Sequence, residues 1–171
     1  MIHKKLKKIR LLLLDVDGIL TDGSIIYTHS GEEIKSFNSK DGLGIKLLMA
    51  AGVQVGIITG RKSKALASRC RDLGIDLVFD GIKNKINALE TILKQTEIPY
   101  QETGFMGDDL PDLPVMKRVG ISITVSDASR DVIKQADITT SLNGGQGAVR
   151  QICEDILKAK GLWGKATAEF L

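Results

Sequence analysis

The sequence is poor in aromatic side chains, proline and cysteine, and these shortages exclude several classes of protein. Phe, Trp and Tyr make up only 4% of the 171 residues, so the core has to be aliphatic, as it is in buried parallel strands. Only three prolines occur, and we find no repeat, low-complexity segment or domain linker. Cys70 and Cys153 form no CxxC motif, which argues against a zinc site and predicts small buried or half-buried thiols.

A long apolar run is also lacking. The run from Ile9 to Leu14 is interrupted by Arg10 and is too short to span a membrane, and no signal-peptide cleavage site follows it. The net charge of +3 comes largely from lysines near the start of the chain. Because no aromatic residues lie between these lysines, we expect a solvated arm over residues 1–8 rather than a nucleic-acid or membrane partner. A cytoplasmic protein is predicted.

Strand-like and helix-like segments alternate along the chain. This alternation predicts an α/β fold with a mostly parallel sheet between two helix layers, a Rossmann-like three-layer arrangement. Strands are expected at 10–15, 53–59, 77–79, 104–107, 121–125 and 138–140. Helices are expected at 41–51, 63–73, 85–95, 113–119, 128–135 and 148–158.

The first strand is followed by a polar, β-rich stretch that predicts a small hairpin. Segments 24–28 and 33–37 flank a turn that contains Gly31. We expect a single domain over 1–171, with the arm at 1–8, the hairpin at 18–38 and a tail at 161–171. Trp163 and Phe170 in the tail either dock on a neighbouring subunit or belong to a mobile end.

Acidic residues follow the predicted strands in a regular order. The first strand ends in Asp15-Val16-Asp17-Gly18, the second in Thr59-Gly60-Arg61 and the fourth in Gly107-Asp108-Asp109, while Lys85 begins a helix. Any one of these aspartates could simply cap a helix. Because the carboxyl ends of parallel strands meet at one edge, the whole set instead predicts a ligand site there.

The residue types in this set fit phosphoryl transfer. Two carboxylates that converge on one point repel each other unless a cation or a proton offsets them. Magnesium binds through a few carboxylates together with substrate phosphate and water. The Thr59 hydroxyl and the Lys85 ammonium are suited to holding phosphoryl oxygens, because this chemistry needs positioning and charge neutralisation.

These four motifs resemble those of the haloacid dehalogenase superfamily, and the resemblance extends over most of the chain. It implies that Asp15 is the nucleophile and that Asp17 is the general acid and base. It also implies that Thr59 and Lys85 bind the phosphoryl group, and that Mg²⁺ is held by Asp15, Asp108 and the backbone carbonyl of Asp17. Asp109 or Asp112 would orient the metal's water ligands, and the residues leave open which one.

There is room for no cap domain between the motifs, so a capless phosphatase is expected. Further motifs, among them Asp15 to Gly23, Asp41-Gly42-Leu43-Gly44-Ile45 and Gly144 to Arg150, resemble the subfamily of 3-deoxy-D-manno-octulosonate (KDO) 8-phosphate phosphatases. That resemblance implies a phosphorylated sugar acid as substrate, a role in lipopolysaccharide synthesis, and a homotetramer in which a neighbouring subunit closes the site. It also implies substrate contacts from Asp17, Asn38, Ser39, Lys40, Asp41, Gly42, Lys46, Gly60, Arg61, Arg69 and Lys85.

Three other functions stay open at this point. A phosphatase for a sialic acid 9-phosphate, or for a related nine-carbon keto sugar acid, would use the same motifs. A phospho-accepting receiver domain also combines acidic residues with Thr and Lys, although its accepting Asp follows a middle strand. A non-catalytic module would show no activity on any substrate.

Overall fold

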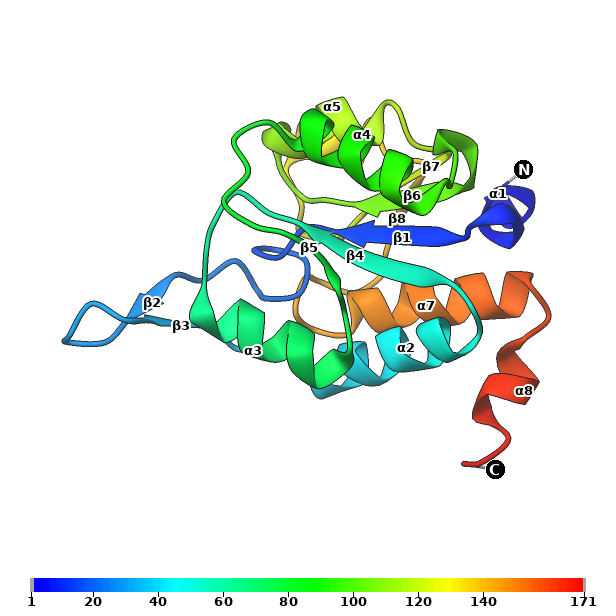
Figure 1. The fold of residues 1–171 in the computed structure, drawn as a ribbon, viewed down its shortest axis with the longest axis horizontal. Helices are drawn as coiled ribbons and strands as arrows, with labels where there is room; N and C mark the ends of the chain where they lie inside the picture. Colours follow the sequence, from blue (N-terminus) through cyan, green and yellow to red (C-terminus); the bar gives the residue numbers. More distant parts are fainter. Residues whose placement is uncertain (1, 171) are drawn as a thin grey trace.

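A six-stranded parallel sheet forms the centre of the molecule, with strand order β5-β4-β1-β6-β7-β8 (Figure 1). The structure, a computed structural model, describes residues 2–170. The predicted parallel α/β arrangement is confirmed. The strands are β1 (Leu11–Leu14), β4 (Gln54–Ile58), β5 (Leu77–Phe79), β6 (Thr103–Met106), β7 (Ile121–Thr124) and β8 (Ile138–Thr139).

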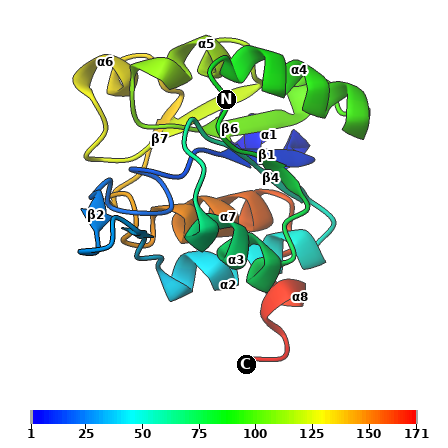
Figure 2. The same cartoon turned by 60° about the vertical axis from the view of Figure 1, so that its left-hand side comes forward.

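Helices cover both faces of the sheet, as Figures 1 and 2 show from two directions. One layer contains α2 (Ser39–Ala50), α3 (Lys64–Leu73) and α7 (Ala148–Ala159), and α2 packs along α7. The opposite layer contains α4 (Lys85–Thr96), α5 (Leu113–Met116) and α6 (Arg130–Ile133). The remaining helical segments are α1 (Ile2–Lys8), η1 (Tyr100–Glu102), η2 (Leu110–Asp112) and α8 (Trp163–Thr167).

The all-leucine strand β1 joins the two halves of the core. Leu11 and Leu13 pack in the cluster that includes α4 and α5, while Leu12 and Leu14 pack in the cluster that includes α2 and α7. Successive side chains of a strand point to opposite faces, so an unbroken apolar run suits a strand that is covered on both. Each fully buried leucine contributes roughly 1.5–3 kcal/mol to folding. The central strand is therefore held firmly at the point where Asp15 follows it.

The loop after β1 leads into a hairpin that projects from the carboxyl edge of the sheet (Figure 1). Its strands β2 (Ile26–Tyr27) and β3 (Glu33–Ile34) pair antiparallel, with Ile26 opposite Ile34. Gly31 has a φ of 82° and lies in the turn, as expected. The strands are shorter than the predicted segments 24–28 and 33–37, because neither joins the main sheet.

The start of the chain differs from the solvated arm that we expected over 1–8. Residues 2–8 form α1, whose Leu6 is buried, and Ile2 packs against the core. Lys5 makes an ion pair of 2.8 Å with Asp137, which lies between α6 and β8. The spacing of Ile2 and Leu6 places them on one helix face, and the intervening lysines hid this short apolar stripe. Met1 lies outside the described residues.

The end of the chain turns back onto its own molecule. In α8, the Trp163 ring lies 5.6 Å from the Arg150 guanidinium and 5.2 Å from the Lys158 ammonium, both on α7. Phe170 remains exposed, and Leu171 lies outside the described residues.

Both cysteines are buried free thiols, as predicted: Cys70 on α3 and Cys153 on α7. No helix within residues 2–170 combines the length and the hydropathy that a membrane span requires.

Candidate active site

The predicted motif residues meet in one cleft at the carboxyl edge of the sheet. Asp15 directly follows β1, Thr59 directly follows β4, and Asp108 follows β6 after one glycine. Lys85 enters from the opposite helix layer as the first residue of α4. The cleft has a volume of about 350 Å³ and is lined by Asp15, Asp17, Gly23, Thr59, Gly60, Arg61, Lys85, Asp108, Asp109, Pro111 and Asp112.

Lys85 pairs with two of the carboxylates that line this cleft. Its Nζ lies 2.9 Å from Asp15 Oδ2 and 2.7 Å from Asp112 Oδ1. All three side chains are largely buried. The second oxygen of Asp15, Oδ1, is buried without a hydrogen-bond partner among residues 2–170. A buried carboxylate oxygen left unpaired is costly, so this oxygen is free to take a metal ion or an electrophile.

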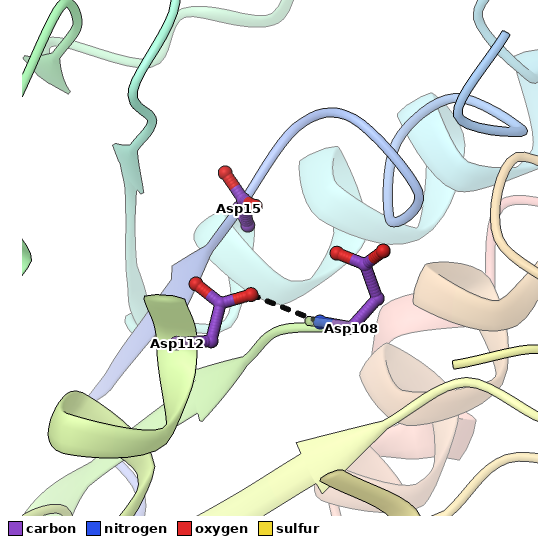
Figure 3. Close-up of side chains that lie close together, drawn as sticks. All are labelled: Asp15, Asp108 and Asp112. Atoms are coloured by element: carbon purple, nitrogen blue, oxygen red, sulfur yellow. Dashed lines mark hydrogen bonds between the residues drawn. The ribbon is translucent and has the colours of Figure 1, made fainter. Parts of the chain in front are cut away.

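Asp112 supports the loop that carries Asp108. Its Oδ2 accepts hydrogen bonds from the backbone N–H groups of Asp108 at 3.0 Å and Asp109 at 3.3 Å, the first of which is drawn in Figure 3. Asp112 is 1% exposed, whereas Asp109 is exposed. Of the two candidates for a supporting role beside a metal, Asp112 is thus the one placed at the cluster.

Two glycines allow the carboxylates to approach so closely. A Cβ on Gly18, whose φ is 83°, would collide with the Asp108 carboxylate, and a Cβ on Gly107 would collide with Asp112. Both positions therefore require the absence of a side chain. The glycines of the motifs Asp-x-Asp-Gly and Gly-Asp-Asp are thus part of the geometry of the site.

Burial and the surplus of negative charge in the cluster shift the pKa values of Asp15, Asp108 and Lys85. Burial raises the pKa of Asp15 to about 6, with Asp112 adding to the rise and Lys85 opposing it. Burial together with Asp15 and Asp112 raises the pKa of Asp108 to about 7. Burial alone would lower the pKa of Lys85, but Asp15 and Asp112 raise it above its ordinary value.

These residues fit a magnesium ion. Carboxylate oxygens of Asp15, Asp108 and Asp112 lie within 4.8 Å of one another (Figure 3). Hard oxygen ligands, a surplus of negative charge and the unpaired Asp15 oxygen are what a divalent cation would satisfy. The Asp17 carboxylate lies outside this group, and the sequence prediction assigned the metal only its backbone carbonyl.

The Asp17 carboxylate faces the hairpin instead. One oxygen pairs with Lys35, and the other lies 3.8 Å from Arg61 Nε. Glu33 contacts both cations, at 2.6 Å from Lys35 and 3.2 Å from Arg61. We call these four residues the hairpin network. Lys35 and Glu33 were missed in the sequence analysis, since the contact of Lys35 with Asp17 and those of Glu33 with Lys35 and Arg61 depend on how the hairpin folds over the strand end.

Thr59 and Gly60 line the cleft beside Arg61. The Thr59 backbone is fixed by its N–H donating to Phe79 O at 2.9 Å. Within residues 2–170, its hydroxyl oxygen accepts a single long bond of 3.5 Å, from the Arg61 N–H. The hydroxyl proton therefore remains available to an anion in the cleft.

Other predicted substrate contacts lie outside the residues that line this cleft. Asp41 is buried and accepts a 2.8 Å hydrogen bond from the Arg150 N–H in the first turn of α7. Arg69 packs on Gly42, and it donates to Asn38 O at 3.1 Å. Ser39, Lys40 and Lys46 are exposed on α2. Their predicted contact with substrate stays a prediction.

Comparisons with known proteins identify the family to which these cleft residues belong. A family profile described as haloacid dehalogenase-like hydrolase matches residues 75–152. The 3-deoxy-D-manno-octulosonate 8-phosphate phosphatase of Escherichia coli K12 is 45% identical over 92% of this chain and 84% of its own length. The corresponding protein of Yersinia pestis is 42% identical over 89% of this chain and 81% of its own length.

Solved structures give the same result. The phosphatase of that name from Moraxella catarrhalis, crystallised with magnesium ion, phosphate ion and KDO, superposes with a TM-score of 0.97 at 40% identity, covering 99% of this chain and 98% of that one. A cobalt-bound form from Haemophilus influenzae gives 0.90 at 43% identity, covering 93% of each chain. This chain belongs to the haloacid dehalogenase-like hydrolases, in the family of the 3-deoxy-D-manno-octulosonate 8-phosphate phosphatases.

Proposed function

We infer that this chain is a magnesium-dependent phosphatase that hydrolyses KDO 8-phosphate to KDO and phosphate, in lipopolysaccharide synthesis. The observation that carries this inference is the cluster of Asp15, Lys85, Asp108 and Asp112 in the cleft. Its support is the near-complete superposition on a relative crystallised with magnesium, phosphate and KDO. The family membership supports a phosphoric monoester hydrolase in particular.

Asp15 is proposed as the nucleophile. It stands at the end of a fully buried strand, and Lys85 holds one of its oxygens while the other has no hydrogen-bond partner among residues 2–170. An Asp15 oxygen would form a bond to phosphorus as the bond between phosphorus and the sugar oxygen breaks. The product of this step is an aspartyl-phosphate and a free sugar.

Asp17 is proposed as the general acid and then the general base. It would give its proton to the departing sugar oxygen, because an alkoxide is a poor leaving group. It would then take a proton from the water that attacks the aspartyl-phosphate and releases phosphate. Its position at the cleft, two residues after Asp15, supports this role.

The remaining cleft residues are suited to binding the phosphoryl group. Lys85 would lie beside its oxygens, and the Thr59 hydroxyl and Gly60 would contact it from the β4 side. Asp15, Asp108 and the backbone carbonyl of Asp17 would hold Mg²⁺, with Asp112 in support. When bound, the metal neutralises negative charge on the phosphoryl oxygens.

The sugar acid would extend from the cleft toward the hairpin. Arg61 is suited to its carboxylate, since its guanidinium lines the cleft and its side chain is 38% exposed there. The other predicted contacts, namely Asn38, Ser39, Lys40, Asp41, Gly42, Lys46 and Arg69, lie outside the cleft of their own chain. If they contact substrate, they would do so across a subunit boundary.

A homotetramer is part of this proposal. Four large apolar side chains of the hairpin are exposed in the single chain: Ile25, Ile26, Tyr27 and Ile34. Covering such side chains with neighbouring subunits would remove an exposed apolar patch and close an open site. We further propose a single-domain, cytoplasmic enzyme with no nucleic-acid or membrane partner.

The test is phosphate release from KDO 8-phosphate, with Mg²⁺ and with EDTA, beside a sialic acid 9-phosphate. We expect release that requires metal and that is faster for KDO 8-phosphate. Faster release from the nine-carbon substrate would keep the mechanism and discard the substrate. Formation of a stable phospho-enzyme without phosphate release would instead indicate a receiver, and inactivity on all phosphorylated compounds a non-catalytic module.

A further inference from the structure

We propose that Lys35 is a positioning residue that sets the orientation of the Asp17 carboxylate and so couples the hairpin to proton transfer onto the leaving group. This rests on the proposed function, in which Asp17 is the general acid. Lys35 follows β3 and belongs to the hairpin. It therefore reaches Asp17 from an element separate from the sheet that carries Asp15.

The contacts of Lys35 are those of a fixed bridge. Its ammonium lies between Asp17 Oδ1 and Glu33 Oε1, with a separation of 2.6 Å from the latter. Its side chain is 2% exposed. A lysine side chain has many rotamers, and ordering it costs entropy. Burial between two carboxylates therefore holds the ammonium in one place, and with it the oxygen of Asp17 that it faces.

Arg61 completes the arrangement from the other side. Its Nε lies 3.8 Å from the second Asp17 oxygen, and its terminal nitrogen pairs with Glu33 at 3.2 Å and with the Tyr27 hydroxyl at 3.2 Å. Each Asp17 oxygen thus faces one cation. Glu33 contacts both cations, so the hairpin sets the position of the pair and the carboxylate between them.

Removing one of these cations would leave Asp17 free to turn. The hairpin network contains two carboxylates and two cations, so its charges balance. Without Lys35, Arg61 alone would face both carboxylates, and we expect Asp17 and Glu33 to compete for it. A carboxyl group displaced in this way is poorly placed to donate a proton, even when the fold and the Asp15 cluster are intact.

A comparison of leaving groups separates this role from a purely structural one. As the phosphorus–oxygen bond of a sugar phosphate breaks, the departing oxygen needs the Asp17 proton. The nitrophenolate that leaves p-nitrophenyl phosphate is a weak base and departs without one. The ratio kcat/KM reports only the steps up to departure of the leaving group, so it isolates this difference.

The experiment compares Lys35→Met with wild type on both substrates in Mg²⁺. General acid catalysis is worth roughly 10²–10⁴-fold, so we expect kcat/KM for KDO 8-phosphate to fall by about 10²-fold or more. For p-nitrophenyl phosphate we expect a loss of less than about fivefold on the same grounds. Lys35→Arg, which keeps the cation, should restore most of the loss on the sugar phosphate.

The matched control is Lys62→Met, which removes an exposed lysine next to Arg61 that belongs to no ion pair within residues 2–170. It should leave kcat/KM for both substrates near the wild-type value. Equal losses on the two substrates in Lys35→Met, or no loss on either, would overturn the proposal. Wild-type inactivity on both substrates would remove the proposed function, and this inference with it.

Discussion

The two walls of the cleft are built in opposite ways. The wall at the sheet edge carries Asp15, Asp108, Asp112 and Lys85, three carboxylates against one ammonium. The hairpin network of Asp17, Glu33, Lys35 and Arg61 has two of each sign. The first wall follows strands that are buried on both faces. The second places Asp17 and Arg61 at the cleft, after β1 and β4, and pairs them with Glu33 and Lys35 of a hairpin whose strands have two residues each.

This difference separates binding from positioning. A cluster with excess negative charge and an unpaired buried oxygen lacks a cation, so it is prepared for a metal and the phosphoryl group that accompanies the metal. A network that is already neutral has no such deficit, and its effect is to hold a side chain in place. Changes to the first wall should therefore act on chemistry and metal affinity, and changes to the second on orientation.

The largest effect is expected from Asp15→Asn. Loss of the nucleophile should lower kcat by at least about 10⁴-fold, as removal of a covalent nucleophile does elsewhere. The folded structure should persist, because the amide can still contact Lys85 through its oxygen. Rapid-quench assays for a phospho-enzyme should detect one in wild type and none in the variant. A variant that retains phosphate release would show that another group attacks phosphorus.

A smaller effect is expected from Asp112→Asn, with Asp109→Asn as its matched control. Asp112 pairs with Lys85 and accepts two backbone hydrogen bonds, whereas Asp109 is exposed. We expect about 10–100-fold weaker Mg²⁺ affinity for the Asp112 variant, the usual cost of losing a residue that supports metal ligands. Titration of activity against Mg²⁺ measures this. Equal effects of the two variants would contradict the supporting role of Asp112.

The pH dependence of stability gives a third comparison. The pKa values of Asp15 and Asp108 rise from 3.8 to about 6 and about 7 in the folded protein. The folded state thus binds these protons more tightly than the unfolded state. The metal-free protein should lose stability as the pH rises from about 4 through 7. Melting temperatures in EDTA at pH 5 and pH 8 measure this loss, and Mg²⁺ should reverse it at pH 8.

Asp108→Asn is the control for this dependence, because it removes the carboxyl group with the higher of the two pKa values. Its melting temperature in EDTA should change less between pH 5 and pH 8 than that of wild type. If wild type without metal has a higher melting temperature at pH 8 than at pH 5, the surplus negative charge of the sheet-edge wall does not destabilise the fold.

The smallest effect on the chain itself is expected from Ile26→Ser. This side chain is 48% exposed, and exposed positions contribute within about 0.5 kcal/mol to folding. Its effect should fall on assembly: light scattering should report a lower mass than for wild type at equal concentration. Leu142→Ser, at a leucine outside the hairpin that is 42% exposed, is the control. An unchanged mass would count against assembly through the hairpin.

The sheet-edge wall could be predicted from the sequence, and the reason is local. Asp15, Thr59 and Asp108 each follow an apolar run. Parallel strands bring their carboxyl ends to one edge of the sheet, and this does not depend on the conformation of the loops. Lys85 could be placed with them because it starts a helix after the third strand. The periodicity of the apolar residues and the order of strands and helices along the chain are sufficient to place these residues.

The hairpin network and the hydrogen bond between Asp41 and the start of α7 could not be predicted in this way. Lys35 is 18 residues from Asp17 in sequence, and the contact depends on how a short hairpin folds back. Asp41 was assigned to substrate, yet its carboxylate accepts a hydrogen bond from a residue 109 positions away, at the start of α7. Long-range contacts of charged side chains leave no periodic signal in a single sequence.

Burial of both native cysteines also makes the molecule convenient for labelling. Burial raises the pKa of Cys70 to about 11 and raises that of Cys153 even further above its ordinary value. Because the thiolate is the reactive form, neither thiol should take up a maleimide dye in the folded protein. A single Ile25→Cys substitution, at a position that is 52% exposed, would then carry the only probe. Hairpin movement and subunit proximity could be followed by fluorescence without first removing the native cysteines.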